Sequence, residues 1–266
     1  MGRSSNKKGI KKFNDNYEFN DKDFETVTPF YFNCDSIPDI EFKPKNNKQA
    51  DLMKKLNENI VNFVIGEVGT GKTTVPVIYS LQMLKKKKYK KIMLFRPTSI
   101  AERENIGFLK GDMQEKISPL ILPLRSAIEK FASRQIFESL VKSGYIEPYH
   151  LGHIGGMTYS NSIVILDEFQ NCDSKTMRML LTRIDDTSKV IIVGDGNQIV
   201  FSDKEYLESA FHDIERFKDK SKIGFTVFDK RDIVRGEITK IIESCYPEED
   251  SEISIKYKEW LNNESN

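Results

Sequence analysis

Long apolar runs and a signal peptide are both missing from this sequence. No stretch of its 266 residues approaches the roughly 18 consecutive apolar residues that a membrane-spanning helix needs. The N-terminus, Met1 to Phe13, is basic and polar and lacks the apolar core of a secretory signal. We therefore expect no membrane partner and a cytoplasmic location, in a bacterial cytosol or in the cytosol of a phage host.

Cysteine is also scarce. The cysteines Cys34, Cys172 and Cys245 lie far apart, which is typical of reduced thiols and matches no zinc-binding spacing. His150 and His153 have no cysteine and no third histidine nearby. A metal held by cysteine and histidine is therefore not expected.

Net charge is nearly absent, because 41 lysines and arginines face 40 acidic residues. The charge is unevenly placed, with a basic excess in the first fifteen residues and a second basic run from Lys85 to Lys91. Such runs usually lie on a solvated surface, and contact with nucleic acid is the alternative. The composition, rich in lysine and asparagine, is typical of an AT-rich genome such as that of a phage.

Short apolar segments with the length of β-strands alternate with helical patterns. These segments are Ile60–Ile65, Lys91–Phe95, Ser162–Leu166, Val190–Val193 and Ile223–Phe228. Strands that are apolar on both faces are typical of a parallel sheet covered on both sides. Apolar spacing predicts helices after Gly71 and after the N-cap Asp173. The sequence thus predicts a three-layer α/β fold with a mostly parallel sheet.

Composition divides the chain into three parts. Residues 1–44 are polar and basic and are expected to form a tail and an extension that packs on the main domain. Residues 45–246 carry the strand and helix patterns, and residues 247–266 form an acidic C-terminal helix or tail. No linker rich in Gly, Ser or Pro marks a second independent domain.

The strongest motif runs from Gly66 to Thr73 and reads G-E-V-G-T-G-K-T, which matches the phosphate-binding P-loop. Its glycines let backbone N–H groups surround an anion, and the helix that follows points its positive end at the phosphates. Lys72 is expected to contact the β- and γ-phosphates, and Thr73 to ligate Mg²⁺. The expected ligands of ATP are Gly66, Gly69, Thr70, Gly71, Lys72, Thr73 and Thr74, with Gln49 in a position suited to reading the adenine.

Two further apolar segments end in polar residues. The first ends in Asp167-Glu168, where Asp167 would hold Mg²⁺ through water and Glu168 would polarise the attacking water. The second ends in Gly194-Asp195 and is followed by Gln198, which is placed to hydrogen-bond the γ-phosphate or the attacking water. Because parallel strands share one carboxyl edge, these residues are predicted to join the P-loop in one site.

These ordered motifs resemble those of PhoH-family proteins, whose ATPase domain is similar to the RecA-like core of superfamily-one helicases. The resemblance runs from about Lys45 to Ser244, and its segments are Arg96-Pro97, Gly107–Pro119, Ile165–Asn171, Leu181–Ile184, Gly194–Gln198 and Asp232–Arg235. Lys110 replaces a proline of the family pattern, and Gly155-Gly156-Met157-Thr158 stands where the family tends to carry Arg-Gly-Arg-Thr. The lost arginines weaken the inference of nucleic-acid contact.

The resemblance implies a Mg²⁺-dependent ATPase that works with single-stranded nucleic acid, RNA more than DNA, in binding, remodelling or helicase activity. It also implies a homo-oligomer, a hexameric ring, in which Arg235, or failing that Arg231, serves as an arginine finger for the neighbour's ATP. A surface salt bridge is the alternative role of either arginine.

Two other functions stay open. One is an ATP-switched oligomeric RNA-binding regulator with little turnover. The other is a different P-loop enzyme, such as a nucleotide kinase or a packaging motor. Glu168 argues against a kinase, because a kinase positions a substrate hydroxyl and needs no residue that activates water.

Overall fold

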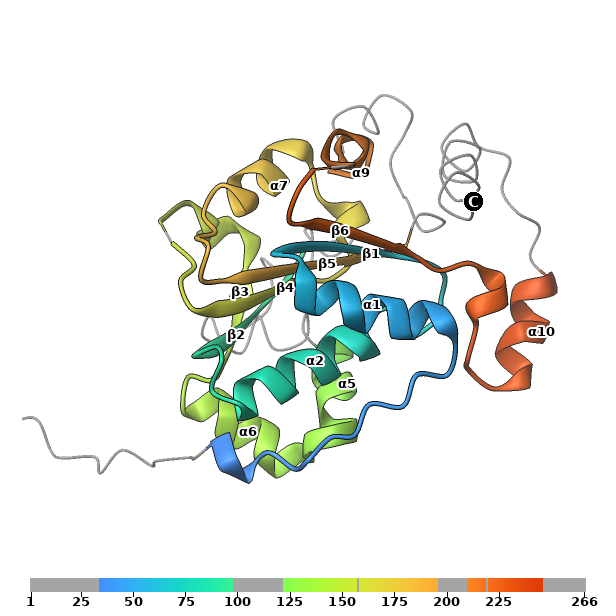
Figure 1. The fold of residues 1–266 in the computed structure, drawn as a ribbon, viewed down its shortest axis with the longest axis horizontal. Coiled ribbons are helices and arrows are strands. Elements are labelled where there is room, and N and C mark those ends of the chain that lie inside the picture. The colour runs from blue at the N-terminus through green and yellow to red at the C-terminus, as the bar shows by residue number, and fades with distance from the viewer. Residues whose placement is uncertain (1–33, 98–121, 157, 196–209, 219, 246–266) are drawn as a thin grey trace, which may run out of the picture. The chain divides into compact units, whose positions relative to one another are not determined.

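The computed structural model describes residues 34–97, 122–156, 158–195, 210–218 and 220–245. These residues contain a six-stranded sheet of order β3-β2-β4-β5-β1-β6, in which every neighbouring pair is parallel (Figure 1). The strands are β1 (Val61–Ile65), β2 (Lys91–Arg96), β3 (Ile146–His150), β4 (Ser162–Leu166), β5 (Lys189–Gly194) and β6 (Ile223–Val227). Strand β5 therefore separates the P-loop strand β1 from the acidic strand β4.

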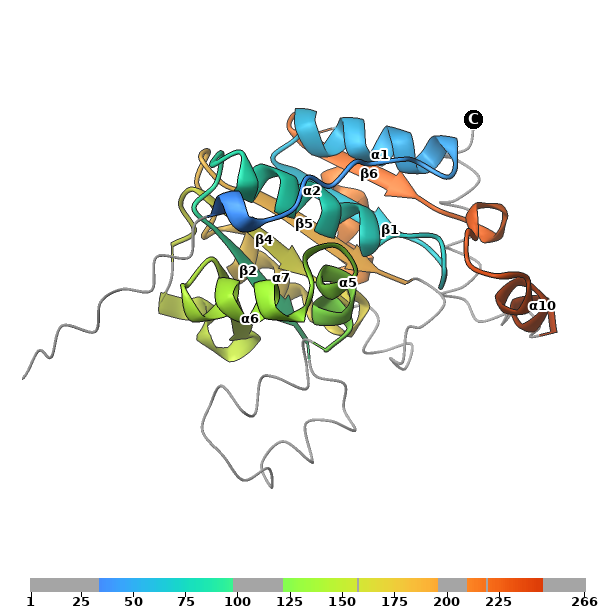
Figure 2. The same ribbon diagram turned by 90° about the horizontal axis from the view of Figure 1, so that it is seen from below.

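Helices cover both faces of this sheet. They are α1 (Asn47–Glu58), α2 (Thr74–Lys85), α5 (Leu122–Ala132), α6 (Arg134–Lys142), α7 (Ser174–Leu181) and α9 (Ala210–Asp213). A further helix, α10 (Glu237–Cys245), lies to one side of the sheet (Figures 1 and 2). Helices α1, α2, α5 and α6 bury their apolar residues in one core cluster, and α7 and α9 bury theirs in a second cluster on the opposite face. Figure 2 shows the first face from outside. The predicted three-layer α/β fold is confirmed, and among the described residues no helix has the length and apolar character to cross a membrane.

Short 3₁₀ turns join several of these elements: Cys34–Ser36, Leu151–Gly156, Phe169–Asn171, Ile214–Phe217 and Lys230–Asp232. The predicted N-cap is present, because the side chain of Asp173 accepts a hydrogen bond from the backbone N–H of Thr176 at 2.7 Å. This bond satisfies one of the free N–H groups at the start of α7.

Strand β3 is the one strand of the described sheet that the sequence patterns missed. It reads I-E-P-Y-H, so it lacks the continuous apolar character of the other strands and contains Pro148. It pairs with β2 alone, at the edge of the sheet. A proline that cannot donate a ladder hydrogen bond is tolerated at an edge, and an edge strand buries less surface.

The stretch before α1 lies along α2. Ile37 is fully buried in the core cluster, and the side-chain amide of Gln82 donates a hydrogen bond to the backbone oxygen of Ile40 at 2.7 Å. Ion pairs link Lys85 to Asp39 and other lysines of the basic run to carboxylates. Because α2 starts at the P-loop and ends at Lys85, this partly neutralised run lies at the far end of α2 from the P-loop.

Candidate nucleotide site

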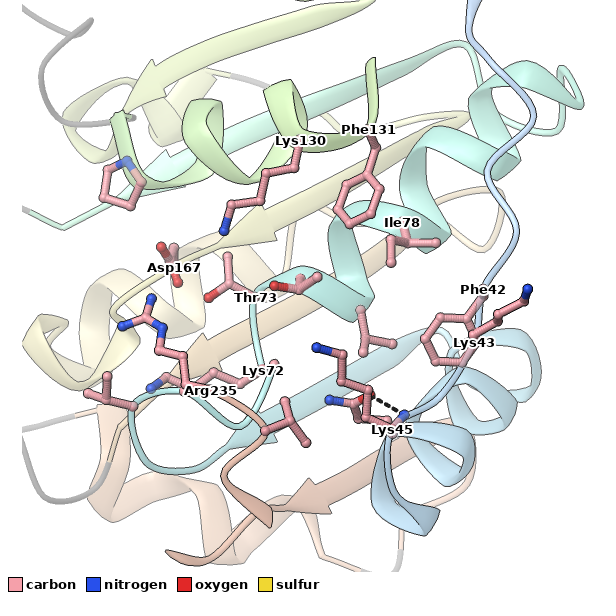
Figure 3. Close-up of a pocket in the computed structure, with 18 of the residues that line it drawn as sticks. Phe42, Lys43, Lys45, Lys72, Thr73, Ile78, Lys130, Phe131, Asp167 and Arg235 are labelled. Carbon is pink, nitrogen blue, oxygen red and sulfur yellow. Dashed lines mark hydrogen bonds between the residues drawn. The ribbon is translucent and has the colours of Figure 1, made fainter. Parts of the chain in front are cut away.

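The segments that follow β1, β4 and β5 meet at the carboxyl edge of the sheet, where open α/β folds bind ligands. A cavity of about 920 Å³ opens there (Figure 3). Most of the predicted site residues line this cavity: Gln49, Gly69, Gly71, Lys72, Thr73, Thr74, Asp167, Glu168 and Arg235. The loop residues Gly66 and Thr70 are buried and do not line it.

The backbone of the P-loop has the conformation that its glycines permit. Gly69 and Gly71 have φ angles of +84° and +94°, a region that is strained for any residue with a side chain. Helix α2 starts directly behind the loop, and its first turn includes a hydrogen bond from the N–H of Val75 to the oxygen of Gly71 at 3.1 Å. The first N–H groups of a helix have no partner within the helix, and Thr73, Thr74 and Val75 at this helix start line the cavity, as an anion site requires.

Gln49 holds the P-loop in place. Its side-chain oxygen accepts a hydrogen bond from the backbone N–H of Lys45 at 2.9 Å, and its side-chain nitrogen donates to the backbone oxygen of Thr70 at 2.9 Å. The side chain is 5% exposed, and a Cβ atom on Gly71 would lie only 2.6 Å from its nitrogen. Both ends of the amide are therefore engaged within the protein, which differs from the adenine-reading role expected for this residue.

Lys72 forms an ion pair that the motifs did not reveal. Its ammonium group lies 3.1 Å from a carboxylate oxygen of Asp195, and the two side chains are 12% and 2% exposed. Asp195 follows β5, so the sheet order brings this carboxylate next to the P-loop. A bound phosphate would compete with Asp195 for the ammonium group of Lys72.

The carboxylates after β4 differ in environment. Asp167 is 3% exposed, and burial, together with the nearby charge of Glu168, raises its pKa to about 7, although Arg96 and Lys72 oppose the rise. Glu168 is less buried and has a φ angle of +58°, a strained conformation for a residue that is not glycine. This strain occurs at the residue that was predicted to activate water.

Gln170 connects the carboxylate of Glu168 to the end of β5, and the sequence analysis did not identify this residue. Its side-chain nitrogen donates a hydrogen bond to a carboxylate oxygen of Glu168, and its side-chain oxygen accepts one from the backbone N–H of Asp195 at 3.1 Å. The side chain is 1% exposed. Gln170 therefore fixes the orientation of Glu168 relative to the end of β5. The feature of the sequence that could have identified Gln170 is its position two residues after Glu168.

The two candidate arginines have different surroundings. Arg235 lines the cavity of its own chain, and the N–H of Val234 donates to the oxygen of Gly69 at 3.0 Å. Arg231 instead contacts both carboxylate oxygens of Asp229, at 3.0 and 2.8 Å, and this hydrogen bonding lowers the pKa of Asp229. Arg231 thus forms a salt bridge, whereas Arg235 lies beside the P-loop of its own chain.

The oxygen donors at this site fit Mg²⁺. Thr73 and Asp167 line the same cavity, and both offer hard oxygen ligands. The described residues contain no group of three or more His, Cys, Asp or Glu side chains arranged to hold a metal. Mg²⁺ is usually held by one or two side chains together with phosphate oxygens and water, and Thr73 with Asp167 would supply two such side chains.

Some predicted residues lie outside the part of the chain that the structure describes. Gln198 falls in the segment 196–209, and the whole stretch Gly107–Pro119 falls in the segment 98–121. The roles expected for these residues stay predictions.

Fold and loop together define a P-loop nucleotide-binding protein. The family model described as PhoH-like protein matches residues 41–247, and the chain belongs to this family. A PhoH-like protein of Bacillus subtilis (strain 168) is 36% identical over 201 residues, which cover 75% of this chain and 62% of that protein. Protein PhoH of Escherichia coli (strain K12) is 29% identical over 196 residues, covering 73% of this chain and 55% of that protein. The chain spans about three fifths of the length of the first curated relatives that it matches.

Solved structures that align with most of this chain include a terminase and a helicase. The large terminase from a thermophilic bacteriophage aligns with a TM-score of 0.47 and 12% identity, covering 77% of this chain and 51% of the terminase. The Pif1 helicase from Candida albicans aligns with a TM-score of 0.32 and 12% identity, covering 71% of this chain and 41% of the helicase.

Proposed function

We propose that this protein hydrolyses ATP with Mg²⁺ and couples hydrolysis to single-stranded nucleic acid, RNA more than DNA. One observation carries the proposal: a single cavity gathers a P-loop, oxygen donors for Mg²⁺, a carboxylate that can activate water and an arginine. Membership of the PhoH family supports the same activity. The site is less suited to a nucleotide kinase, because a kinase needs no residue such as Glu168 that activates water.

The side chains divide the work of hydrolysis among them. Lys72 leaves Asp195 and places its ammonium group on the phosphates, while the N–H groups of the P-loop hold the remaining oxygens. Mg²⁺, held by Thr73 and Asp167, would neutralise phosphate charge. Glu168 accepts the proton of the attacking water on its carboxylate, which Gln170 orients.

Arg235 supplies a further positive charge to the site. Its position beside Gly69 puts a guanidinium group within the same cavity, where negative charge develops as the bond to the γ-phosphate breaks. We therefore assign to Arg235 the stabilisation of this charge from within its own chain.

The nucleic-acid part of the proposal concerns the basic N-terminus. The lysine run at the end of α2 is partly paired with carboxylates, which leaves residues 1–13 as the first candidate contact. Deletion of residues 1–13 should weaken binding of single-stranded RNA and reduce the slope of log Kd against log salt, because fewer counterions are released. An unchanged slope would show that these residues make no contact.

The deciding assay measures steady-state ATP hydrolysis with Mg²⁺, alone and with single-stranded RNA or DNA, with Lys72→Ala as the inactive control. Hydrolysis by the wild type that the strand stimulates, RNA more than DNA, is the expected result. ATP and RNA binding with negligible hydrolysis under all conditions would favour the ATP-switched regulator. Wild-type hydrolysis no higher than that of Lys72→Ala would contradict the proposed ATPase.

A further inference from the structure

The nucleotide cavity has two ends of different chemistry (Figure 3). One end carries the P-loop, the carboxylates and Arg235 described above. The other end carries the apolar side chains of Phe42, Ile78 and Phe131, with the charged side chains of Lys43 and Lys130 beside them. A nucleotide has the same two-part character, because charged phosphates are joined through a sugar to a flat base.

The apolar end is built by three separate elements. Phe42 comes from the stretch that lies along α2, Ile78 from the second turn of α2 and Phe131 from α5. Ile78 is 6% exposed, whereas Phe42 and Phe131 are half-buried and pack against the edge of the core cluster. The two aromatic side chains therefore have core contacts that fix them while they also border the cavity. Ile78 follows Thr74, the first residue of α2, by one helical turn, so this end directly adjoins the P-loop.

The cavity offers little that reads the edge of a base. The amide of Gln49 is committed to the backbone of Lys45 and Thr70. Four charged residues also line the cavity, and all of them are exposed: Glu41, Lys43, Lys45 and Lys130. Glu41 and Lys43 form an ion pair at 3.1 Å and are 76% and 79% exposed. Exposed, solvated charges of this kind discriminate weakly between hydrogen-bonding partners, whereas a site built to hydrogen-bond its substrate rejects a wrong one by about 10⁴–10⁵.

We propose that Phe42 and Phe131 form the nucleobase site, in which the base is held by stacking and apolar contact. Every base has an aromatic face, so stacking is tolerant of base identity. Consequently the protein accepts guanine nucleotides almost as well as adenine nucleotides. This inference rests on the proposed function, because it concerns the same nucleotide.

The test measures Kd by calorimetry on the full chain for the Mg²⁺ complexes of ATP, GTP and inorganic tripolyphosphate, which has phosphates and no base. Phe42→Leu and Phe131→Leu remove the ring face and keep most of the apolar volume, so folding is preserved. Phe217→Leu is the matched control, because Phe217 is also half-buried but packs in the core cluster on the opposite face of the sheet.

We expect each of the two cavity variants to raise the Kd for ATP and GTP by about fivefold or more, the low end of one base–aromatic stack. The Kd for tripolyphosphate should stay at the wild-type value, and Phe217→Leu should change none of the three. In the wild type, the Kd values for ATP and GTP should differ by less than about tenfold, since no hydrogen bond to the base is required.

Other results overturn the inference in separable ways. Unchanged ATP binding in both cavity variants would place the base elsewhere. If those variants bound ATP normally but lost binding of single-stranded RNA, the two rings would contact RNA and the inference would also fail. Equal loss of tripolyphosphate and ATP binding would mean that the rings support the P-loop and do not contact the base. A preference for ATP over GTP of more than about a hundredfold would require hydrogen-bond recognition. If the wild type bound none of the three compounds, the proposed function would fail, and this inference with it.

Discussion

At the scale of single residues, Glu168 combines backbone strain with the chemistry of the site. Its left-handed backbone is held by its neighbours, since Gln170 contacts its carboxylate and the N–H of Asn171 donates to its backbone oxygen at 3.0 Å. Strain of this kind persists where the surrounding structure fixes it, often at functional positions. A carboxylate with a fixed direction is what activation of one water molecule requires.

Glu168→Gln should therefore retain nucleotide binding and reduce turnover. The amide keeps the size of the side chain but cannot accept the proton of water, so we expect hydrolysis to fall by about 10²–10⁴ with an unchanged Kd for ATP. Steady-state hydrolysis and calorimetry measure the two quantities. Near wild-type hydrolysis would remove Glu168 from the mechanism.

The raised pKa of Asp167 predicts how the stability of the protein depends on pH. Its pKa rises from 3.8 in the unfolded chain to about 7 in the folded protein, so the folded state binds the proton more tightly. Without ligand, the free energy of unfolding should fall as pH rises from about 4 to 7, because a buried carboxylate becomes ionised.

Asp167→Asn removes the free-energy cost of ionising this buried carboxylate. We expect the variant without ligand to exceed the wild type in stability at pH 8, by an amount on the order of 3 kcal/mol, and to resemble it near pH 4. Denaturant unfolding at both pH values, without nucleotide or Mg²⁺, measures the difference. Equal stability of the two proteins at pH 8 would show that Asp167 carries no such cost.

At the scale of elements, the junction between β1 and the P-loop depends on close approach to the chain after β6. The N–H of Phe228 donates to the oxygen of Ile65 at 2.8 Å, and the N–H of Gly66 donates to the oxygen of Gly194 at 3.1 Å. A Cβ atom on Gly66 would lie 2.5 Å from the Cβ of Phe228. Because hydrogen bonds fix both neighbours, the backbone cannot move away without losing them.

Gly66→Ala should consequently destabilise the fold and disturb the P-loop. Overpacking of this kind typically costs about 1–3 kcal/mol in the free energy of unfolding, and we also expect weaker ATP binding. Gly155→Ala is the matched control, because a Cβ atom there meets nothing within 4 Å. Chemical denaturation and calorimetry compare the two, and an equal effect of both substitutions would refute the packing argument.

At the scale of the whole molecule, the placement of Arg235 bears on assembly. The guanidinium group reaches the cavity of its own chain, so Arg235 is placed to contact a phosphate bound by the same chain. A homo-oligomer, the hexameric ring of the resemblance, stays a proposal. Its support is that α10, which starts two residues after Arg235, exposes Ile238 and Ile242 at 65% and 48%. Light scattering with and without ATP and Mg²⁺ measures the number of subunits.

A mixing experiment tests whether Arg235 acts within its own chain. Lys72→Ala and Arg235→Ala should each be nearly inactive, since an arginine at the transferred phosphate is worth about 10³–10⁵ in turnover. If Arg235 serves its own site, a mixture of the two variants should hydrolyse ATP no faster than the sum of the separate proteins. Restored hydrolysis in the mixture would place Arg235 in the site of a neighbouring subunit.

The sequence by itself determined the layered fold, the P-loop and the carboxylates, because these depend on short-range patterns. A strand buried on both faces must be apolar throughout, and a loop that surrounds an anion needs glycine at fixed spacing. The five predicted strands match β1, β2, β4, β5 and β6 to within one residue at each end.

Only the tertiary structure decided which of these groups meet. Lys72 and Asp195 are 123 residues apart in the chain and pair because β5 lies next to β1. Strand order and helix packing likewise decide which backbone groups Gln49 binds and which groups Gln170 links. They also decide that Phe42 and Phe131 line one cavity. Those are set by burial summed over the whole core, a quantity that no local motif contains.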